Sequence, residues 1–337
     1  MRRRRALLLL VSAVALVLLW PQLFAVYREL GTIRHVAPGW LVAIVFMVVV
    51  QMVSNWELHR ILLRTSRWFD VAAPQLAGNA ASHLFPGGNA VGAGIQVRML
   101  TTAGFDLTRV ATSLGAFSIL GTVSGFVVLP FVVLLASAAG SRVDGDLIAA
   151  MWLGSALLLV LLVAIVVAVR RDTPWARLAR VVAWGQRRLH RPHDVDELEL
   201  RLLHERDHIR DALRDRAGLV AFIAVTRPLC DYLTLLLSLR AVGAHVNPAA
   251  VLAAFIVSNI AGMIPLTPGG LGFVEASLDG VLIVAGATTV DAHLAVALYR
   301  VAETWLPCLA GGAAVVWFRH RYPAARHAQY AITPSDR

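Results

Sequence analysis

The chain has 337 residues, of which 58% are hydrophobic and only 15% are charged, with a net charge of +10. Soluble domains carry roughly 25% charged residues, so this composition excludes an ordinary soluble enzyme and indicates a protein embedded in a lipid bilayer. All 31 basic residues are arginine. Their concentration in the connections between apolar segments argues for membrane orientation rather than for binding nucleic acid.

Six apolar segments predict helices that cross the membrane, because a spanning helix needs about 20 apolar residues. They are residues 6–26, 40–57, 110–138, 147–169, 217–239 and 292–318. The first follows "MRRRR" and resembles a secretory signal, but its apolar run continues past Pro21 without a clean cleavage site. We therefore expect a retained signal-anchor helix. The arginine-only usage is typical of a GC-rich bacterial genome, which places the protein in a bacterial plasma membrane.

The distribution of arginine predicts the orientation, because cytoplasmic loops collect basic residues. Arg2 to Arg5 place the N-terminus in the cytoplasm, and the tail 319–337 places the C-terminus there too. Residues 170–216 hold twelve arginines and form a cytoplasmic linker between a first half, 1–169, and a second half, 217–318.

The linker has two readings. Residues 170–191 carry seven arginines against one aspartate, with apolar residues between them, which is typical of a basic helix lying on anionic membrane lipids. Alternatively, the linker is a solvated helical hairpin that only joins the two halves. Its tryptophans and arginines do not by themselves indicate a nucleic-acid partner.

Two apolar regions are interrupted by helix-breaking residues. Residues 72–103 contain "HLFPGGNAVGAG", and residues 249–286 contain "PLTPGG" between arms that are too short to cross a bilayer. Non-helical backbone at membrane depth persists only where protein buries it or where it lines a cavity. Both regions are therefore predicted to be re-entrant helical hairpins.

The two predicted hairpins are similar, since an offset of 182 residues aligns their Pro-Gly-Gly breaks. The predicted orientation has the first entered from the cytoplasm and the second from outside, which is an inverted repeat. Secondary transporters are often built in this way, with substrate sites where broken helices meet. The fold prediction is thus an all-α polytopic membrane protein with about six full transmembrane helices and two re-entrant hairpins.

The motifs "SNIAGMIPLTPGGLGFVEASLDGVLIVAG" and "ALYRVAETWLPCLAGG" resemble the transmembrane region of lysylphosphatidylglycerol synthase/flippase proteins and their stand-alone relatives. The resemblance covers nearly the whole chain, although Gly92, Ala93 and Gly94 stand where relatives often carry an acidic residue. It implies a flippase-like membrane protein. The chain ends 19 residues after Phe318, so we expect no aminoacyl-transferase domain and no lysyl transfer.

Charged residues inside apolar segments are candidates for function, because each charge at bilayer depth costs roughly 2.5–3.5 kcal/mol. Arg300 with Glu303, and Arg227 with Asp231, could simply neutralise each other along one helix. Glu275 and Asp279 lie one turn apart without a basic residue nearby in sequence, so Arg300 or Arg227 could serve them.

Three further polar residues have both a structural and a functional reading. Asn259 is expected to hydrogen-bond the backbone of the break. Arg98 either faces a lipid phosphate or extends to the cytoplasmic headgroups, and His83 is expected to be a hydrogen-bonded core residue. The candidate substrate-binding residues are Gly87, Gly88, Arg98, Arg227, Asp231, Asn259, Pro268, Gly269, Gly270, Gly272, Glu275, Arg300 and Glu303.

The predicted function is movement of an anionic lipid, or of a lipid-linked precursor such as a polyprenyl phosphate, between leaflets. Helix N-termini at the breaks and Arg300 would hold the phosphate, and Glu275 would gate the site. No catalytic, metal or cofactor motif is found. The alternatives are a membrane-embedded transferase acting on lipid-linked substrates and a non-catalytic partner of cell-envelope enzymes. A second copy of the chain is a further candidate partner.

Overall fold

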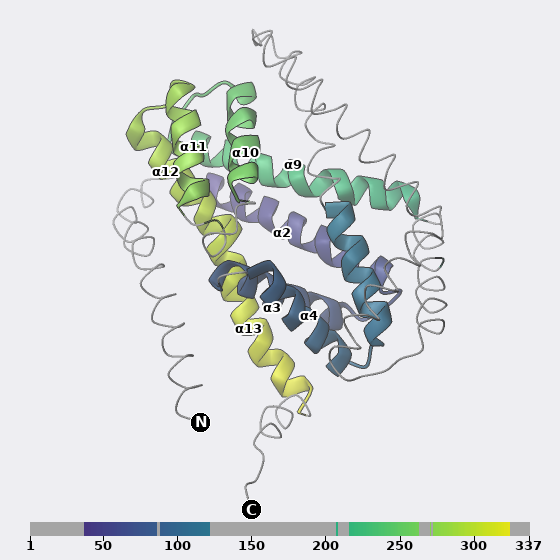
Figure 1. Ribbon diagram of the computed structural model, residues 1–337. Coiled ribbons are helices and arrows are strands. Elements are labelled where there is room, and N and C mark those ends of the chain that lie inside the picture. The colour runs from purple at the N-terminus through teal and green to yellow at the C-terminus, as the bar shows by residue number, and fades with distance from the viewer. Residues whose placement is uncertain are drawn as a thin grey trace, which may run out of the picture. The chain divides into compact units, whose positions relative to one another are not determined.

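The structure is a computed structural model that describes residues 37–85, 88–121, 207, 216–262, 270 and 272–323 (Figure 1). All regular elements in these ranges are helices, as predicted. The chain divides into two compact units, one formed by residues 1–50, 73–96 and 230–321 and the other by 51–72, 97–229 and 322–337. The predicted spans 6–26 and 147–169 and the basic segment 170–191 lie outside the described residues.

Three long apolar helices confirm three of the predicted spans. They are α2 (Pro38–Leu62), α9 (Ala217–Ala241) and the continuous helix Thr289–Arg321. Each of the two 25-residue helices is about 37 Å long, enough for a hydrocarbon core of about 30 Å. Of the predicted span 110–138, the structure describes the beginning, within the helix Leu107–Gly121.

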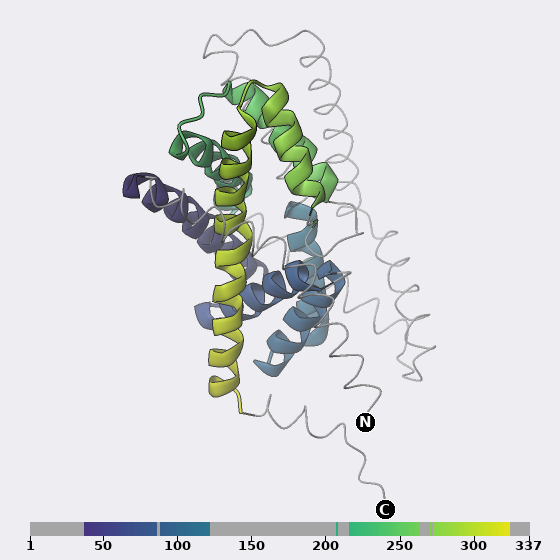
Figure 2. The same ribbon diagram turned by 90° about the vertical axis from the view of Figure 1, so that its left-hand side faces the viewer.

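The third long helix is composite. It consists of α12 (Thr289–Arg300), the π-helical segment η2 (Val301–Trp305) and α13 (Leu306–Arg321), and Figure 2 shows α13 continuing directly from the preceding segments. The π segment has a local cause. Proline lacks an N–H, and in an α-helix the ring of Pro307 would clash with the carbonyl of Glu303. The Leu306 N–H instead bonds the Val301 carbonyl, five residues back.

The first broken region forms a helical hairpin, as predicted. Helix α3 (Trp68–Leu84) ends before the break, and α4 (Gly88–Thr102) begins at its last glycine. The contacts show that the helices are antiparallel. A Cβ added at Gly92 would overlap the Gly78 carbonyl oxygen, and one added at Gly88 would overlap the Ser82 carbonyl oxygen. Glycine therefore permits backbone contact along the hairpin.

The second broken region is also a hairpin. Helix α10 (Pro248–Gly262) packs against α11 (Phe273–Val284), beside which α12 lies (Figure 1). At 15 and 12 residues these helices are about 22 and 18 Å long, too short to cross a bilayer. The break is longer than the first one, because α11 begins three residues after Gly270, whereas α4 begins at the equivalent glycine.

Helix α13 makes a close contact with α3 within the first unit. A Cβ added at Gly311 would lie 2.5 Å from the Leu76 carbonyl oxygen and 2.7 Å from the Ala80 methyl group. Gly311 is buried, whereas its neighbour Gly312 is exposed and has open space where a Cβ would stand. The contact therefore requires glycine at one position only.

Four helices end in the same turn, a Schellman motif in which a residue with positive φ follows the last helical turn. Glycine occupies this position after three of them, at Gly104, Gly243 and Gly286. After α2 the position is Arg64, with φ 47°, and the Thr65 N–H bonds the Arg60 carbonyl as the motif requires. A left-handed conformation costs a non-glycine residue roughly 1–2 kcal/mol, so Arg64 occupies a position at which glycine would be more stable.

Candidate functional site

The centre of the candidate site is the carboxylate of Glu275 in the first turn of α11. Its Oε2 accepts a hydrogen bond of 2.7 Å from the Gly272 N–H, which would otherwise be an unsatisfied donor at the start of the helix. Its Oε1 accepts a bond of 2.7 Å from Nε of Arg300. One carboxylate thus joins the positive end of a helix to a guanidinium.

Arg300 is the last residue of α12 and is buried, and its side chain is 11% exposed against 24% for that of Glu275. A buried arginine needs an anion or several carbonyl acceptors. The partner found here is Glu275, which confirms one of the pairings considered from the sequence. The ion pair connects the helix that begins at the break to the helix that leads into the π segment.

Tyr299, the neighbour of Arg300, contacts a second intramembrane carboxylate. Its hydroxyl donates a 2.7 Å bond to Oδ1 of Asp231 on α9, and its ring is buried. Adjacent residues of α12 therefore hold two acidic side chains from two different helices. Sequence reasoning placed Asp231 beside Arg227 and did not anticipate Tyr299.

Asp279 is paired with His293 of α12 at 2.8 Å. Sequence reasoning suggested Arg300 or Arg227 as the partner of Asp279 and did not indicate His293. The spacing of these charged residues along the chain nevertheless indicates the Asp279–His293 pair. Asp279 lies one turn after Glu275, and His293 lies seven residues, or about two turns, before Arg300. Two antiparallel helices with these spacings bring both pairs together.

The Asp279–His293 pair is expected to be the weaker of the two. The His293 side chain is 54% exposed, and exposed ion pairs stabilise by about 0–1 kcal/mol. We expect His293→Gln to lower the unfolding free energy by less than about 1 kcal/mol and to leave lipid transport intact. Thermal unfolding in detergent together with a transport assay would check this, and loss of transport would place His293 in the site.

The remaining candidate residues are distributed over both units. Arg98 is exposed on α4. The Nη1 atom of Arg227 lies where a side chain at Gly121 would project, 2.8 Å from the position of an added Cβ. Glu303 lies in the π segment, half-buried. Gly87, Pro268 and Gly269 lie outside the described residues, so the turn at each break is not part of the site described here.

The structure bears on two structural expectations. Nδ2 of Asn259 donates a 2.9 Å bond to the Phe255 carbonyl of its own helix. Most of the break lies outside the described residues, so the expected bond from Asn259 to its backbone stays a prediction. His83 was expected to be hydrogen-bonded, but its buried Nδ1 has no partner among the described residues. Cys230 and Cys308 are free and buried.

A comparison with protein families matches residues 6–311 to the lysylphosphatidylglycerol synthase TM region. The match spans most of the 337 residues and contains both hairpins and the Glu275–Arg300 pair. The chain belongs to this family. Together with the three long apolar helices, membership shows a multi-pass membrane protein. No curated protein and no solved structure matches the chain.

Proposed function

We propose that the protein moves an anionic lipid, or a lipid-linked precursor carrying a phosphate, across the bacterial plasma membrane. The observation that carries the proposal is the position of the Glu275 carboxylate, which bonds both the N–H of Gly272, the residue that caps the start of α11, and the guanidinium of Arg300. Helix N-termini and arginine are the groups that proteins use to bind phosphate. An internal carboxylate therefore occupies a site suited to a headgroup.

In the proposed transport mechanism, the headgroup phosphate and the Glu275 carboxylate exchange as the anion bound to Arg300. A headgroup phosphate that enters the break would replace the Glu275 carboxylate on Arg300 and on the start of α11. A phosphate oxygen accepts the same hydrogen bonds, so the guanidinium is never left without an anion at membrane depth. When the headgroup leaves, Glu275 returns to its position.

The proposed architecture has about six full spans and two re-entrant hairpins in an inverted arrangement, with both termini in the cytoplasm. This architecture is supported by the short helices of both hairpins and by the placement of arginine in the loops. Hairpins that enter from opposite faces would offer a headgroup a polar path from each leaflet.

The orientation is tested by labelling single cysteines in intact cells, after Cys230 and Cys308 have been replaced. A cysteine at position 245, in the connection between α9 and α10, should react with an impermeant thiol reagent. One at position 195, in the linker, should react only after the membrane is opened. Labelling of position 195 in intact cells would contradict the inverted arrangement.

The function is tested with purified protein in liposomes, by following fluorescent phosphatidylglycerol, phosphatidylcholine and a polyprenyl phosphate between leaflets. We expect faster exchange of the anionic lipids than of phosphatidylcholine. Matched empty liposomes give the background rate. Equal exchange of all three lipids would indicate non-selective disturbance of the bilayer, and no exchange would favour a role without transport.

A further inference from the structure

Four arginines gather where two connecting segments of the second unit meet. Arg60 lies in the last turn of α2, Arg64 in the turn that follows it, Arg67 just before α3, and Arg109 in the helix that follows α4. We propose that this arginine surface, with the exposed side chains of Trp68 and Leu107, binds the phosphate groups of anionic phospholipids in the adjacent leaflet. The site is separate from Glu275 and Arg300, and the proposal does not rest on the proposed transport.

The arginines hold the two segments together. Nη2 of Arg109 donates to the carbonyls of Leu63 and Arg64, just beyond the end of α2. Nη1 of Arg67 donates to the Ala103 carbonyl, at the end of α4, at 3.4 Å, and its guanidinium lies 4.7 Å from the centre of the Phe105 ring. Cations at helix C-termini are favourable, so these side chains are fixed in place and not dispersed in solvent.

The nearby carboxylates are already engaged within the surface. Glu57 pairs with Arg60 at 2.6 Å. Asp70 is buried, pairs with Arg67 at 3.0 Å and accepts a bond from the Tyr322 hydroxyl. Oδ2 of Asp106 accepts the backbone N–H groups at the start of the next helix. Each of these three carboxylates thus has a hydrogen-bond or ion-pair partner within the surface, and the four arginines outnumber them.

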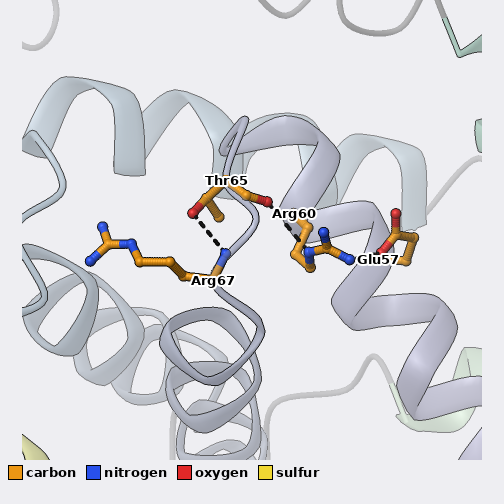
Figure 3. Close-up of polar contacts among 4 residues, drawn as sticks. All are labelled: Glu57, Arg60, Thr65 and Arg67. Atoms are coloured by element: carbon orange, nitrogen blue, oxygen red, sulfur yellow. Dashed lines mark hydrogen bonds and ion pairs between the residues drawn. The ribbon is translucent and has the colours of Figure 1, made fainter.

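Several guanidinium donors are available on this arginine surface. A guanidinium has five N–H donors, and the polar contacts of the Arg67 side chain use only Nη1 although half of the side chain is exposed. Within the part of the chain that the structure describes, Nε and Nη2 of Arg67 have no acceptor. In Figure 3 the side chains of Arg60 and Arg67 extend to opposite sides of Thr65. Phosphate oxygens are the acceptors that arginine forks fit best.

The conformation of Arg64 supports a role in binding. It is exposed and has the positive φ that glycine has at the other three ends of this type. Backbone strain at a non-glycine residue is often associated with function, and here the retained feature is a charge at the surface. Trp68, whose ring centre lies 4.2 Å from the guanidinium carbon of Arg60, is 42% exposed, and Leu107, two residues before Arg109, is 56% exposed. Exposed apolar side chains are expected where a protein meets the headgroup layer.

The test uses nanodiscs that contain either brominated phosphatidylglycerol or brominated phosphatidylcholine. Bromine quenches tryptophan at short range, and the difference between the wild type and Trp68→Phe isolates the signal of Trp68. We expect stronger quenching by the anionic lipid. Equal quenching by both lipids would overturn the proposal, because Trp68 would then report only proximity to the bilayer.

The decisive variant is Arg64→Gly. Glycine suits the backbone conformation, so the melting temperature in detergent without lipid should stay the same or rise. The affinity for phosphatidylglycerol, measured by native mass spectrometry, should fall roughly fivefold for each arginine removed. Arg240→Gln, at the end of α9, is the matched loss of charge elsewhere and should leave the affinity unchanged. If Arg64→Gly and Arg240→Gln bind the lipid equally well, the surface is purely structural.

Discussion

Replacing Arg300 with glutamine should lower the transport of anionic lipids by at least about tenfold and should abolish headgroup binding at the break. The variant removes the cation that holds the Glu275 carboxylate, and loss of one charge-assisted bond to a phosphate is equivalent to about 1.5–3 kcal/mol. It also leaves a half-buried carboxylate without this cation, so we expect a lower melting temperature. Leaflet-resolved transport per folded molecule separates the two effects.

Glu275→Gln is the matched variant, because glutamine keeps the shape and its amide oxygen still accepts the Gly272 N–H. The exchange mechanism predicts the opposite effect on binding. Without a competing carboxylate, Arg300 should hold a headgroup more tightly, while transport slows because nothing displaces the headgroup. The double variant should show that the two effects are not additive, as expected for residues in contact.

A clear set of results would reject the anion exchange. If Glu275→Gln transports every tested lipid at the wild-type rate and Arg300→Gln differs only in stability, the ion pair is structural. If both variants bind phosphatidylglycerol as the wild type does, the headgroup binds elsewhere. Transport of phosphatidylcholine, whose headgroup has no net charge, serves as the control in both cases.

Gly311→Leu should destabilise the protein strongly, by about 3 kcal/mol or more. The added Cβ would meet the Leu76 backbone oxygen at 2.5 Å, and backbone cannot give way as the end of a flexible side chain can. Gly312→Leu is the matched control, since a Cβ there meets open space and both variants gain the same helix propensity. Thermal unfolding in detergent measures the difference between them.

Equal melting temperatures for the two leucine variants would contradict the close contact of α13 with α3. The same logic applies within the first hairpin, where Gly92 touches α3 and Gly94 on the same helix faces open space. Agreement between the two glycine pairs would show that close backbone contact is a general feature of the first unit.

The long helices and the breaks could be predicted because their causes are local. An apolar run of sufficient length predicts α2, α9 and the helix Thr289–Arg321, and Pro-Gly-Gly interrupts both hairpins whatever surrounds it. The need of a membrane carboxylate for a cation likewise indicated Arg300 as a partner of Glu275, although it left Arg227 as an equal alternative.

The remaining contacts depend on how helices are rotated against each other, which the sequence pattern does not specify. Tyr299 reaches Asp231 across 68 positions of the chain, and nothing near either residue indicates the other. The positive φ of Arg64 was equally hidden, because the residue is not glycine. The π segment left one visible trace, Pro307, which we read only as part of the family motif.

The π segment has a consequence for the direction in which the long helix presents its side chains. In an uninterrupted α-helix, Arg300 and Gly311 would face almost the same way, since eleven residues complete about three turns. One extra residue in Val301–Trp305 changes this phase by roughly a quarter of a turn. Thus the Arg300 side chain faces Glu275, while the helix surface at Gly311 faces α3. Eleven residues that include the π segment turn through about the same angle as ten residues of regular α-helix. Deleting Ala302 should therefore remove the π turn and keep both contacts.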